Sequence, residues 1–462
     1  MITKIKINGF KSFHNFEMTF TPFTIIAGTN ASGKSNLFDA LELLSKLAES
    51  DNIKKALQSQ RGEFIELFSM YDKDIYAEFM EFEVEMLVNQ KVKDAWGNEA
   101  VLKYTRLQYQ LKLRRFINQS GLDDIEVIHE KLINLKKDNE DRWIKIIPKD
   151  KIELWRPKVD GNRGGKPYLD TKQVQDIDTV VIHQDGSKGT FRQIPIKNAN
   201  RTVLSSIDNV DFKHVLAAKE EMKSWKFLQL NPDDLREPTS KSNGEDEINS
   251  SGKNLAAALY RISINNTIAL KEISRKLNKF LPQFIEVKVY DDKENRQFII
   301  KLIDKDKKEY TSRVLSEGTL RILTLCILEY DDNFGSLLCF EEPENGIHPA
   351  RISTMLDLLA DLSTDFSDNE LPLKQVIVNT HSSVLVGEFW TNYRNDENKS
   401  LWFSKMISKT DFHKNEKIKF ETTKLSPVDK NFIAELFSDK KVSIIYVKDY
   451  LDNGKFSIDD EK

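Results

Sequence analysis

The residues with the clearest capacity for chemistry form the run Gly28-Thr-Asn-Ala-Ser-Gly33-Lys34-Ser35, which fits the spacing G-x-x-x-x-G-K-[ST]. Glycines at these positions let backbone N–H groups turn inward at the start of a helix, where they can cradle phosphates. Lys34 would bring positive charge to the β and γ phosphates, and the Ser35 hydroxyl would be a Mg²⁺ ligand. The predicted nucleotide contacts are Gly28, Thr29, Asn30, Ala31, Ser32, Gly33, Lys34, Ser35 and Asn36.

A pair of carboxylates, Glu341 and Glu342, directly follows the apolar run 336–340 (SLLCF). At the carboxyl end of a parallel strand, such side chains point into the ligand crevice of an α/β sheet. We expect Glu341 to hold Mg²⁺ through water and Glu342 to act as the base that positions an attacking water. Taken alone, the pair would more simply be an acidic turn after a strand.

Two further runs place polar residues at the ends of expected elements. Residues 315–319 (LSEGT) precede an apolar helix, so Ser316 and Gly318 could form a second anion site at its N-terminus. Residues 375–382 (QVIVNTHS) predict a buried strand that ends close to His381. Alone, the first run is an ordinary helix cap and the second holds a structural histidine. The order of all four motifs along the chain indicates one nucleotide site.

The elements that must position these residues are visible in the apolar pattern. Residues 1–27 predict strands, because Ile2, Ile5 and Ile7 alternate with polar residues and 23–27 is a short buried run. Apolar residues then repeat with helical spacing over 36–48. Further strands are expected at 75–88, 104–116, 125–132, 143–147 and 285–303, and further helices at 212–228 and 255–280.

Composition restricts the class of protein. The chain has 462 residues, of which 39% are hydrophobic and 31% charged, and no apolar run approaches the roughly 18 residues that cross a bilayer. The opening MITKIKINGF lacks the layout of a secretory signal, and Cys326 and Cys339 lie in apolar runs, so we expect a cytoplasmic protein with no membrane association. A net charge of −4 argues against a surface built wholly for nucleic acid.

Shifts in composition divide the chain into parts. The stretch 158–200 and the run 237–253 (EPTSKSNGEDEINSSGK) lack the apolar periodicity of packed elements. The expected parts are two halves of a nucleotide-binding unit (1–150 and 285–390), a polar insertion (151–204), a helical lobe (205–284) that contains a mobile linker (237–253), and a tail that could dock a partner (391–462).

In this order, the motifs resemble the P-loop, signature serine, Walker B carboxylates and switch histidine of the ABC ATPase class. The sequence is similar to the branch that includes the SMC proteins, RecF and the OLD-like or AAA_21 ATPases. The resemblance implies an α/β fold: an ABC-type ATPase head with a mixed sheet around a P-loop core, an antiparallel β insertion and a helical lobe. The similar segments span most of 1–390 and include 8–20 (NGFKSFHNFEMTF), 225–239 (WKFLQLNPDDLREPT), 251–259 (SGKNLAAAL), 340–349 (FEEPENGIHP) and 378–383 (VNTHSS).

The resemblance implies that each ATP site is shared between two subunits. Ser316, Glu317 and Gly318 would meet the ATP held by a second subunit, with Ser316 and Gly318 on its γ-phosphate. Residues 344–348 would cross the dimer interface as the D-loop, and His381 would sense the γ-phosphate. The expected catalytic residues are Lys34, Glu342 and His381, with ATP and Mg²⁺ as cofactors.

Some positions depart from the commonest pattern of this class. Glu341 stands where aspartate is usual, which could change the coordination geometry, and Glu317 and Thr319 stand where glycine and glutamine are commonest. The remaining assignments that the resemblance implies are Gln58 or Gln60 beside Ser35 and Glu341 at the metal, and Lys11 and Phe13 at the adenine or ribose.

The resemblance further implies slow ATP hydrolysis in a homodimer or larger homo-oligomer that opens and closes with nucleotide state. No Asp-x-Asp pair follows His381, so a Toprim nuclease within this chain is not expected, and a nuclease or toxin-like effector would be a separate protein. This arrangement resembles the ATPase subunits of two-gene anti-phage defence systems such as Septu and PARIS.

A RecF-like repair ATPase that binds duplex DNA is the alternative that the sequence leaves open. A transporter ATPase fits least, because nothing in the sequence anchors a membrane partner. Contacts to DNA phosphates need cations, but the candidates in the expected strand alternate, so a solvated sheet face explains them as well. These candidates are Lys103, Arg106, Lys112, Arg114, Arg115, Arg156, Lys158, Arg163 and Lys166.

Overall fold

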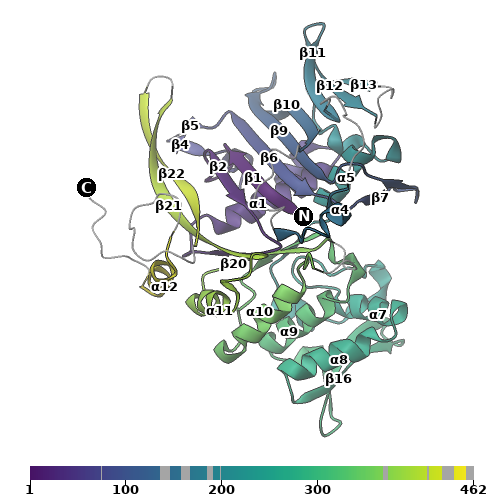
Figure 1. The fold of residues 1–462 in the computed structure, drawn as a ribbon. Helices are drawn as coiled ribbons and strands as arrows, with labels where there is room; N and C mark the ends of the chain where they lie inside the picture. The colour runs from purple at the N-terminus through teal and green to yellow at the C-terminus, as the bar shows by residue number, and fades with distance from the viewer. Residues whose placement is uncertain are drawn as a thin grey trace.

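The computed structural model describes residues 1–73, 75–135, 146–157, 167–184, 191–197, 199–367, 373–413, 416–428 and 442–453. Figure 1 shows a sheet that crosses the middle of the molecule, with a larger sheet on one side and most helices on the other. Within these ranges, no helix combines the length and apolar character needed to cross a membrane.

The larger sheet is antiparallel throughout and has one buried face. In its longest strands, buried and more exposed residues alternate, which is the pattern of a sheet with one face on a core and the other in solvent. The eight strands lie in the order β13 (Phe191–Pro195), β12 (Ile177–His183), β11 (Leu169–Val174), β10 (Asp123–Asn134), β9 (Arg106–Ile117), β6 (Phe79–Leu87), β1 (Ile2–Asn8) and β2 (Phe16–Thr19).

The central sheet has six strands, and the first five strands in its order are parallel to one another. The last strand is antiparallel and forms a long hairpin with the fifth. The order is β14 (Lys226–Leu228), β19 (Leu337–Glu341), β20 (Gln375–Thr380), β3 (Phe23–Ala27), β21 (Lys399–His413) and β22 (Glu416–Pro427).

Both faces of the central sheet are buried, which explains the continuous apolar runs of its strands. Ile26 and Cys339 pack in a core with the larger sheet, whereas their neighbours Ile25 and Phe340 pack in a second core on the opposite face. The first core includes helices α1 (Lys34–Glu49), α2 (Ile53–Gln58) and α5 (Lys213–Lys223), and the second includes α7 (Leu255–Asn265), α8 (Ala269–Phe280), α9 (Glu317–Leu328), α10 (Ile352–Asp361) and α11 (Ser383–Tyr393).

Shorter elements complete the fold. A small sheet covers α7 and α8, and two short hairpins extend from the side of the larger sheet. The small sheet comprises β15 (Thr239–Ser240), β16 (Phe284–Asp292), β17 (Gln297–Asp304) and β18 (Glu309–Thr311); the hairpins are β4 (Met70–Asp72) with β5 (Ile75–Tyr76) and β7 (Lys91–Lys93) with β8 (Glu99–Val101); the other helices are α4 (Ile152–Trp155), α6 (Pro232–Arg236) and α12 (Ile444–Asn453).

The predicted fold class is confirmed, because a mixed sheet carries the P-loop strand and an antiparallel sheet takes all but its first two strands from the sequence after the P-loop. The helical lobe expected at 205–284, however, is not one unit. α5 packs on α1 in the first core, whereas α7 and α8 belong to the second. The reason is β14, which lies between them in sequence, joins the edge of the central sheet beside β19 and carries the chain from one face to the other.

The tail 391–462, expected to dock a partner, begins as part of the central sheet. β21 pairs in parallel with β3, so that Leu401 lies opposite Ile25 and Phe403 opposite Ala27. Leu401 and Phe403 are buried in the second core. The first half of the tail is therefore structural, and any docking role of the rest stays a prediction.

Three other predicted segments have mixed outcomes. Residues 237–253 contain β15, which pairs with β17, so this segment is held by backbone hydrogen bonds. The insertion 151–204 adds β11 to β13 to the larger sheet. Of the strand predicted at 143–147, residues 143–145 lie outside the described residues, and Ile146 and Ile147 are buried but not in a strand.

A buried carboxylate, Glu130 of β10, ties the larger sheet to the helices beneath it. It is fully buried and accepts hydrogen bonds from the Tyr109 hydroxyl (2.9 Å) and from the backbone N–H groups of Val203 (2.7 Å) and Leu204 (2.8 Å). The adjacent Thr202 hydroxyl donates to a backbone carbonyl of α1. Glu130 thus helps to fix α1, and with it the P-loop, against the larger sheet.

We predict that Glu130→Ala lowers the free energy of unfolding by about 3 kcal/mol, because three buried donors lose their acceptor. Urea or thermal unfolding measures the change. Glu17→Ala is the matched control: Glu17 lies on the same sheet, is half exposed and pairs with Lys4 at the surface, so its loss should cost less than about 1 kcal/mol. Equal effects of the two substitutions would contradict the role of Glu130.

Candidate functional site

A loop joins the end of β3 to the start of α1 and lines a pocket of about 380 Å³. Gly33 caps the helix with a φ of +84°, a left-handed conformation that glycine adopts without steric cost. The N-terminus of α1 therefore lies at the pocket, where its free N–H groups favour phosphate. The lining residues are Ser12, Asn30, Ala31, Ser32, Gly33, Lys34, Ser35, Asn36, Glu342, Asn379 and Met406.

The predicted phosphate contacts from Asn30 to Asn36 all line this pocket. Gly28 and Thr29 do not line it, but their carbonyl oxygens each accept a hydrogen bond of 2.7 Å from Lys34 Nζ. Burial lowers the pKa of Lys34 to about 8, although nearby carboxylates, Glu342 foremost, oppose the shift. A phosphate in the pocket would favour the protonated form of this lysine.

Oxygen donors suited to a divalent cation meet beside the P-loop. The Ser35 hydroxyl is hydrogen-bonded to Glu341, and Asn379 Nδ2 donates to Ser35 Oγ at 3.3 Å. Asn379 Oδ1 is buried and makes no hydrogen bond to the described residues. These hydroxyl, carboxylate and amide oxygens fit Mg²⁺, which takes few protein ligands beside phosphate oxygens. Burial raises the pKa of Glu341, although Arg61 and Ser35 oppose the shift, and a cation would oppose it further.

Arg61 brings positive charge to the same carboxylate. Its Nη2 lies 2.8 Å from Asp39 of α1 and 3.6 Å from Glu341. Lys11 Nζ also pairs with Asp39, at 2.6 Å. Among the described residues, no group of three or more His, Cys, Asp or Glu side chains could hold a metal by itself, so a cation at Ser35 and Glu341 would complete its coordination with water or phosphate oxygens.

Glu342 combines an unusual backbone with a position at the pocket. Its φ of +47° lies in the left-handed region, which is strained for a residue with a side chain. Its N–H donates to the Asn379 carbonyl at 2.9 Å, and its carboxylate accepts from Asn345 Nδ2 at 2.8 Å. The other carboxylate oxygen lies 2.9 Å from His381 Nδ1. The structure thus brings together the predicted base and the predicted switch histidine.

The predicted D-loop, residues 344–348, links this end of the pocket to the signature helix. Glu344 is largely buried and accepts a hydrogen bond from Thr380, the residue before His381. Burial also raises the pKa of Glu344, although the Thr380 hydrogen bond opposes the shift. Further along the predicted D-loop, the Gly346 carbonyl packs against Gly318 of the signature helix. A Cβ added to Gly318 would lie only 2.5 Å from the Gly346 carbonyl oxygen.

The signature residues stand apart from the pocket of their own chain. Ser316 caps α9 by accepting from the Thr319 N–H at 3.3 Å, and it is exposed. Glu317 pairs with Arg321 one turn along the helix. None of Ser316, Glu317 and Gly318 lines the pocket described above.

The prediction that Phe13 contacts the adenine or ribose is wrong. Phe13 is fully buried and packs on Phe16 in the first core, because the turn after β1 points its side chain inward. Lys11 does not line the pocket and is engaged by Asp39. The neighbouring Ser12 lines the pocket instead.

The two candidate metal-binding glutamines differ in their surroundings. Gln58 is exposed at the end of α2, and neither glutamine lines the pocket. Gln60 is buried, and its amide atoms make no hydrogen bond to the described residues. Since Gln60 immediately precedes Arg61, which reaches Glu341, it is the better placed of the two, and its metal role stays a prediction.

The sequence did not reveal several residues of the site. Arg61 follows the glutamine candidates but carries no motif of its own. Asn379 lies within the VNTHSS segment, where its place between a strand and His381 could have marked it. Met406 and the hairpin that bears it have no signal in the sequence, because their approach to the P-loop depends on strand pairing across almost the whole chain.

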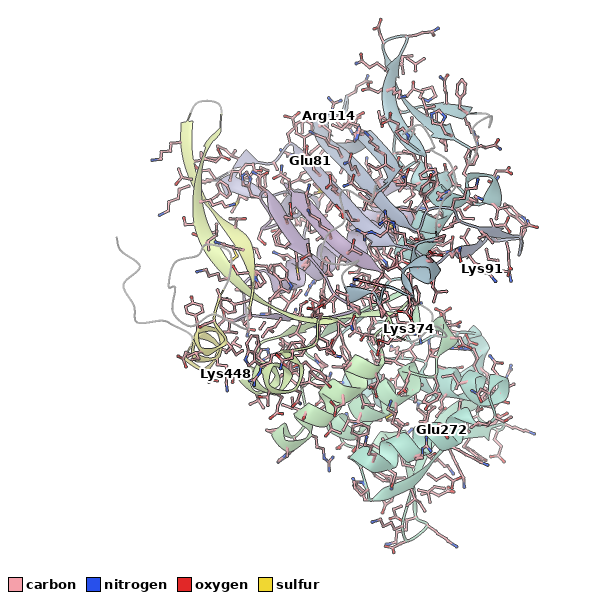
Figure 2. All side chains as sticks on the ribbon, viewed as in Figure 1. Glu81, Lys91, Arg114, Glu272, Lys374 and Lys448 are labelled. Carbon is pink, nitrogen blue, oxygen red and sulfur yellow. The ribbon has the colours of Figure 1, made fainter. Side chains whose placement is uncertain are left out.

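The candidate DNA contacts on the larger sheet are mostly ion-paired. Figure 2 shows Glu81 and Arg114 among the side chains of this sheet. Lys112 pairs with Glu81 at 2.5 Å, and Arg114 Nε lies 2.9 Å from Glu126. The remaining candidates divide as follows: Arg115 pairs with Asp123, Arg106 bonds Thr3 and Glu85, Lys103 is exposed, burial lowers the pKa of Arg156, and Lys158, Arg163 and Lys166 lie outside the described residues.

A family model matches the chain over residues 23–387, which include the P-loop, the signature, both Walker B carboxylates and His381. The family is AAA_21, with the description "AAA domain, putative AbiEii toxin, Type IV TA system". This chain belongs to the AAA_21 family. The AAA_21 part of the resemblance seen in the sequence is therefore confirmed, and the protein carries a nucleotide-binding domain of the ATPase type.

Among solved structures, the AAA_21 chain is similar to several SMC head domains. An SMC head bound to the C-terminal winged-helix domain of ScpA shares 13% identity, with a TM-score of 0.46 over 93% of this chain and 98% of the other. The SMC head from Thermotoga maritima shares 12% sequence identity, with a TM-score of 0.37 over 93% of this chain and 99% of the other. An SMC head from Pyrococcus furiosus, bound to the C-terminal domain of ScpA, also shares 12% identity, with a TM-score of 0.39 over 91% of this chain and 96% of the other. No curated protein matches the chain.

We predict that the affinity for ATP falls as the pH rises above about 8. The free pocket loses the Lys34 proton there, whereas a bound triphosphate keeps the lysine protonated. Between pH 8 and the ordinary lysine pKa of 10.5, the dissociation constant should rise by up to about tenfold per pH unit. Titration with a fluorescent ATP analogue at several pH values measures this dependence.

Lys34→Arg is the control for this experiment, because a guanidinium keeps its charge throughout the same pH range. The variant should bind ATP more weakly than the wild type but with little dependence on pH. A parallel fall in both proteins would assign the pH dependence to another group.

Proposed function

We propose that this AAA_21 chain is an ATPase that hydrolyses ATP slowly in composite sites formed by two copies arranged head to tail. The observation that carries the proposal is the position of Ser316, which is exposed at the N-terminus of α9 yet does not line the pocket of its own chain. A helix N-terminus attracts phosphate. In a head-to-tail dimer, the N-terminus of α9 from one copy would lie at the γ-phosphate of the ATP bound by the other copy.

Within one pocket, each side chain has a task that follows from its place. Lys34 and the N–H groups of the P-loop bind the β and γ phosphates. Glu342, beside His381, orients a water and takes its proton as the water oxygen bonds to the γ-phosphorus and the bridging oxygen leaves with ADP. Mg²⁺ held through Ser35 and Glu341 would neutralise charge that develops on the phosphate oxygens.

The path from α9 to His381 offers a way to couple the two composite sites. Gly318 packs on Gly346, and Glu344 bonds Thr380 directly before His381. Contact of Ser316 with the ATP of the partner would therefore be transmitted through residues 344–348 to the γ-phosphate sensor of the same chain. Loss of the γ-phosphate would release both ends, so nucleotide state would set the opening of the dimer.

We infer that this opening controls a separate effector, in anti-phage defence. Among the described residues, no group of three or more His, Cys, Asp or Glu side chains could hold a metal ion by itself, and the family description names a TA system. A RecF-like DNA-binding role is the alternative. The ion pairs that engage Lys112, Arg114 and Arg115 weigh against it, because these cations would have to exchange carboxylates for DNA phosphates.

Mixing two inactive variants tests the head-to-tail arrangement. Lys34→Ala removes the P-loop function, and Ser316→Arg blocks the signature, so each variant alone should hydrolyse little ATP. In a mixed dimer, the intact P-loop of one variant faces the intact signature of the other and forms one working site. With random pairing, an equimolar mixture should regain about a quarter of the wild-type rate. No recovery on mixing, in proteins that exchange subunits, would contradict composite sites.

Glu342→Gln should keep ATP binding within about threefold of wild type and lower kcat by at least about a hundredfold, because it lacks the base. With ATP and Mg²⁺ it should elute as a dimer, whereas Lys34→Ala should not respond to ATP. Retained turnover in Glu342→Gln would remove Glu342 as the base.

The same trapped protein identifies the partner. A pull-down of Glu342→Gln with ATP and Mg²⁺ from the native cell should recover a stoichiometric effector with nuclease or toxin features, and Lys34→Ala should recover less of it. Duplex DNA without such a protein would instead support the RecF-like alternative.

A further inference from the structure

The β21–β22 hairpin runs directly alongside the P-loop. β21 pairs with β3 only up to Phe403, which lies opposite Ala27, the last residue of β3. Beyond that point, the described residues of β21 pair with β22 alone. The segment after β3 continues as the P-loop. The hairpin therefore extends beyond the central sheet, as Figure 1 shows at the left of the molecule.

Contacts between the hairpin and the P-loop are too close to be incidental. A Cβ on Gly28 would lie 2.6 Å from the Ser404 carbonyl oxygen, and a Cβ on Gly33 would lie 1.8 Å from Thr423 Oγ1. The Ser404 hydroxyl donates to the Ser32 carbonyl at 2.8 Å. Both glycines of the motif thus serve a second purpose here, which is to admit the hairpin.

The pocket has two chemically different sides, set by consecutive residues of α1. Ser35 bonds to Asn379 and to the Glu341 carboxylate of β19, which is the side of the proposed γ-phosphate and metal. Asn36 is rotated by about 100° around the helix and points elsewhere: its Nδ2 donates to Ser12 Oγ at 2.8 Å. Since the γ-phosphate belongs at the Ser35 side, the nucleoside of a bound nucleotide must leave toward the Asn36 side.

A chain of hydrogen bonds on the Asn36 side ends at Met406. Ser12 Oγ lies 2.6 Å from Thr423 Oγ1, and the Thr423 hydroxyl donates to Met406 Sδ at 3.4 Å. Met406 lines the pocket and is half-buried. Its thioether is held in place by Thr423, while its apolar surface remains available to a ligand.

We propose that Met406 is the residue on which the nucleoside of the bound nucleotide packs, so that the C-terminal hairpin completes the ATP site. A polarisable thioether makes favourable contacts with aromatic rings, and a purine base offers such a ring. This inference rests on the proposed nucleotide-binding function and adds a specific contact to it. The contact comes from a strand outside the segment that the family model matches.

Comparison of ATP with inorganic tripolyphosphate, which lacks a nucleoside, tests the proposal. Met406→Ala should weaken ATP binding about tenfold, from the loss of buried apolar contact, and leave tripolyphosphate binding within about twofold of wild type. Met406→Leu, which keeps most of the apolar surface, should bind ATP within about threefold. Calorimetric titration of the full chain with both ligands measures these constants.

Lys34→Ala separates failure of this inference from failure of the proposed function, since it should weaken both ligands. If Met406→Ala weakens both ligands equally, or neither, Met406 is at most a support of the P-loop and the inference is overturned, while the proposed function stands. If the wild type binds neither ligand, or binds both independently of Lys34, the proposed function and the inference fall together.

Discussion

Burial of the central sheet on both faces is the constraint on which the rest of the site depends. Every apolar side chain along β3, β19 and β20 is buried in one core or the other, so the polar side chains that face the pocket lie where these parallel strands end. Their registers place Ala27 opposite Thr380, and Asn379 opposite Glu341. The P-loop, the carboxylates and the histidine therefore meet at one edge, although they lie far apart in sequence.

Desolvation and charge oppose one another at this edge. Burial shifts Lys34, Glu341 and Glu344 toward their neutral forms, in each case against the pull of neighbouring charges or hydrogen bonds. Groups shifted in this way respond strongly to a new charge nearby, which is why they gather at functional sites. Glu342 adds backbone strain on the order of 1 to 3 kcal/mol, held by its bond to the Asn379 carbonyl.

How far the sequence could predict this arrangement follows from the range of each signal. The P-loop, the paired carboxylates and His381 were predictable because each sits at the end of a locally patterned strand. Phe13 and Ser12 were not distinguishable, since one residue of difference in a turn decides which side chain faces the core. The division between α5 and α7 could not be read, because it depends on the edge that β14 joins. The role of Met406 could not be predicted either, because its strand, β21, pairs with β3, which lies almost 400 residues earlier in the sequence.

The position of β21 also bears on where this fold can be divided. The family match ends at residue 387, before β21 and β22 begin. A fragment cut there would leave β3 at the margin of the central sheet, with a row of unpaired N–H and C=O groups flanked by apolar side chains. Such a margin is a template for pairing with another chain. The hairpin thus moves the outer edge of the central sheet from the apolar strand β3 to β22, and we expect a fragment without it to aggregate more readily than the full chain.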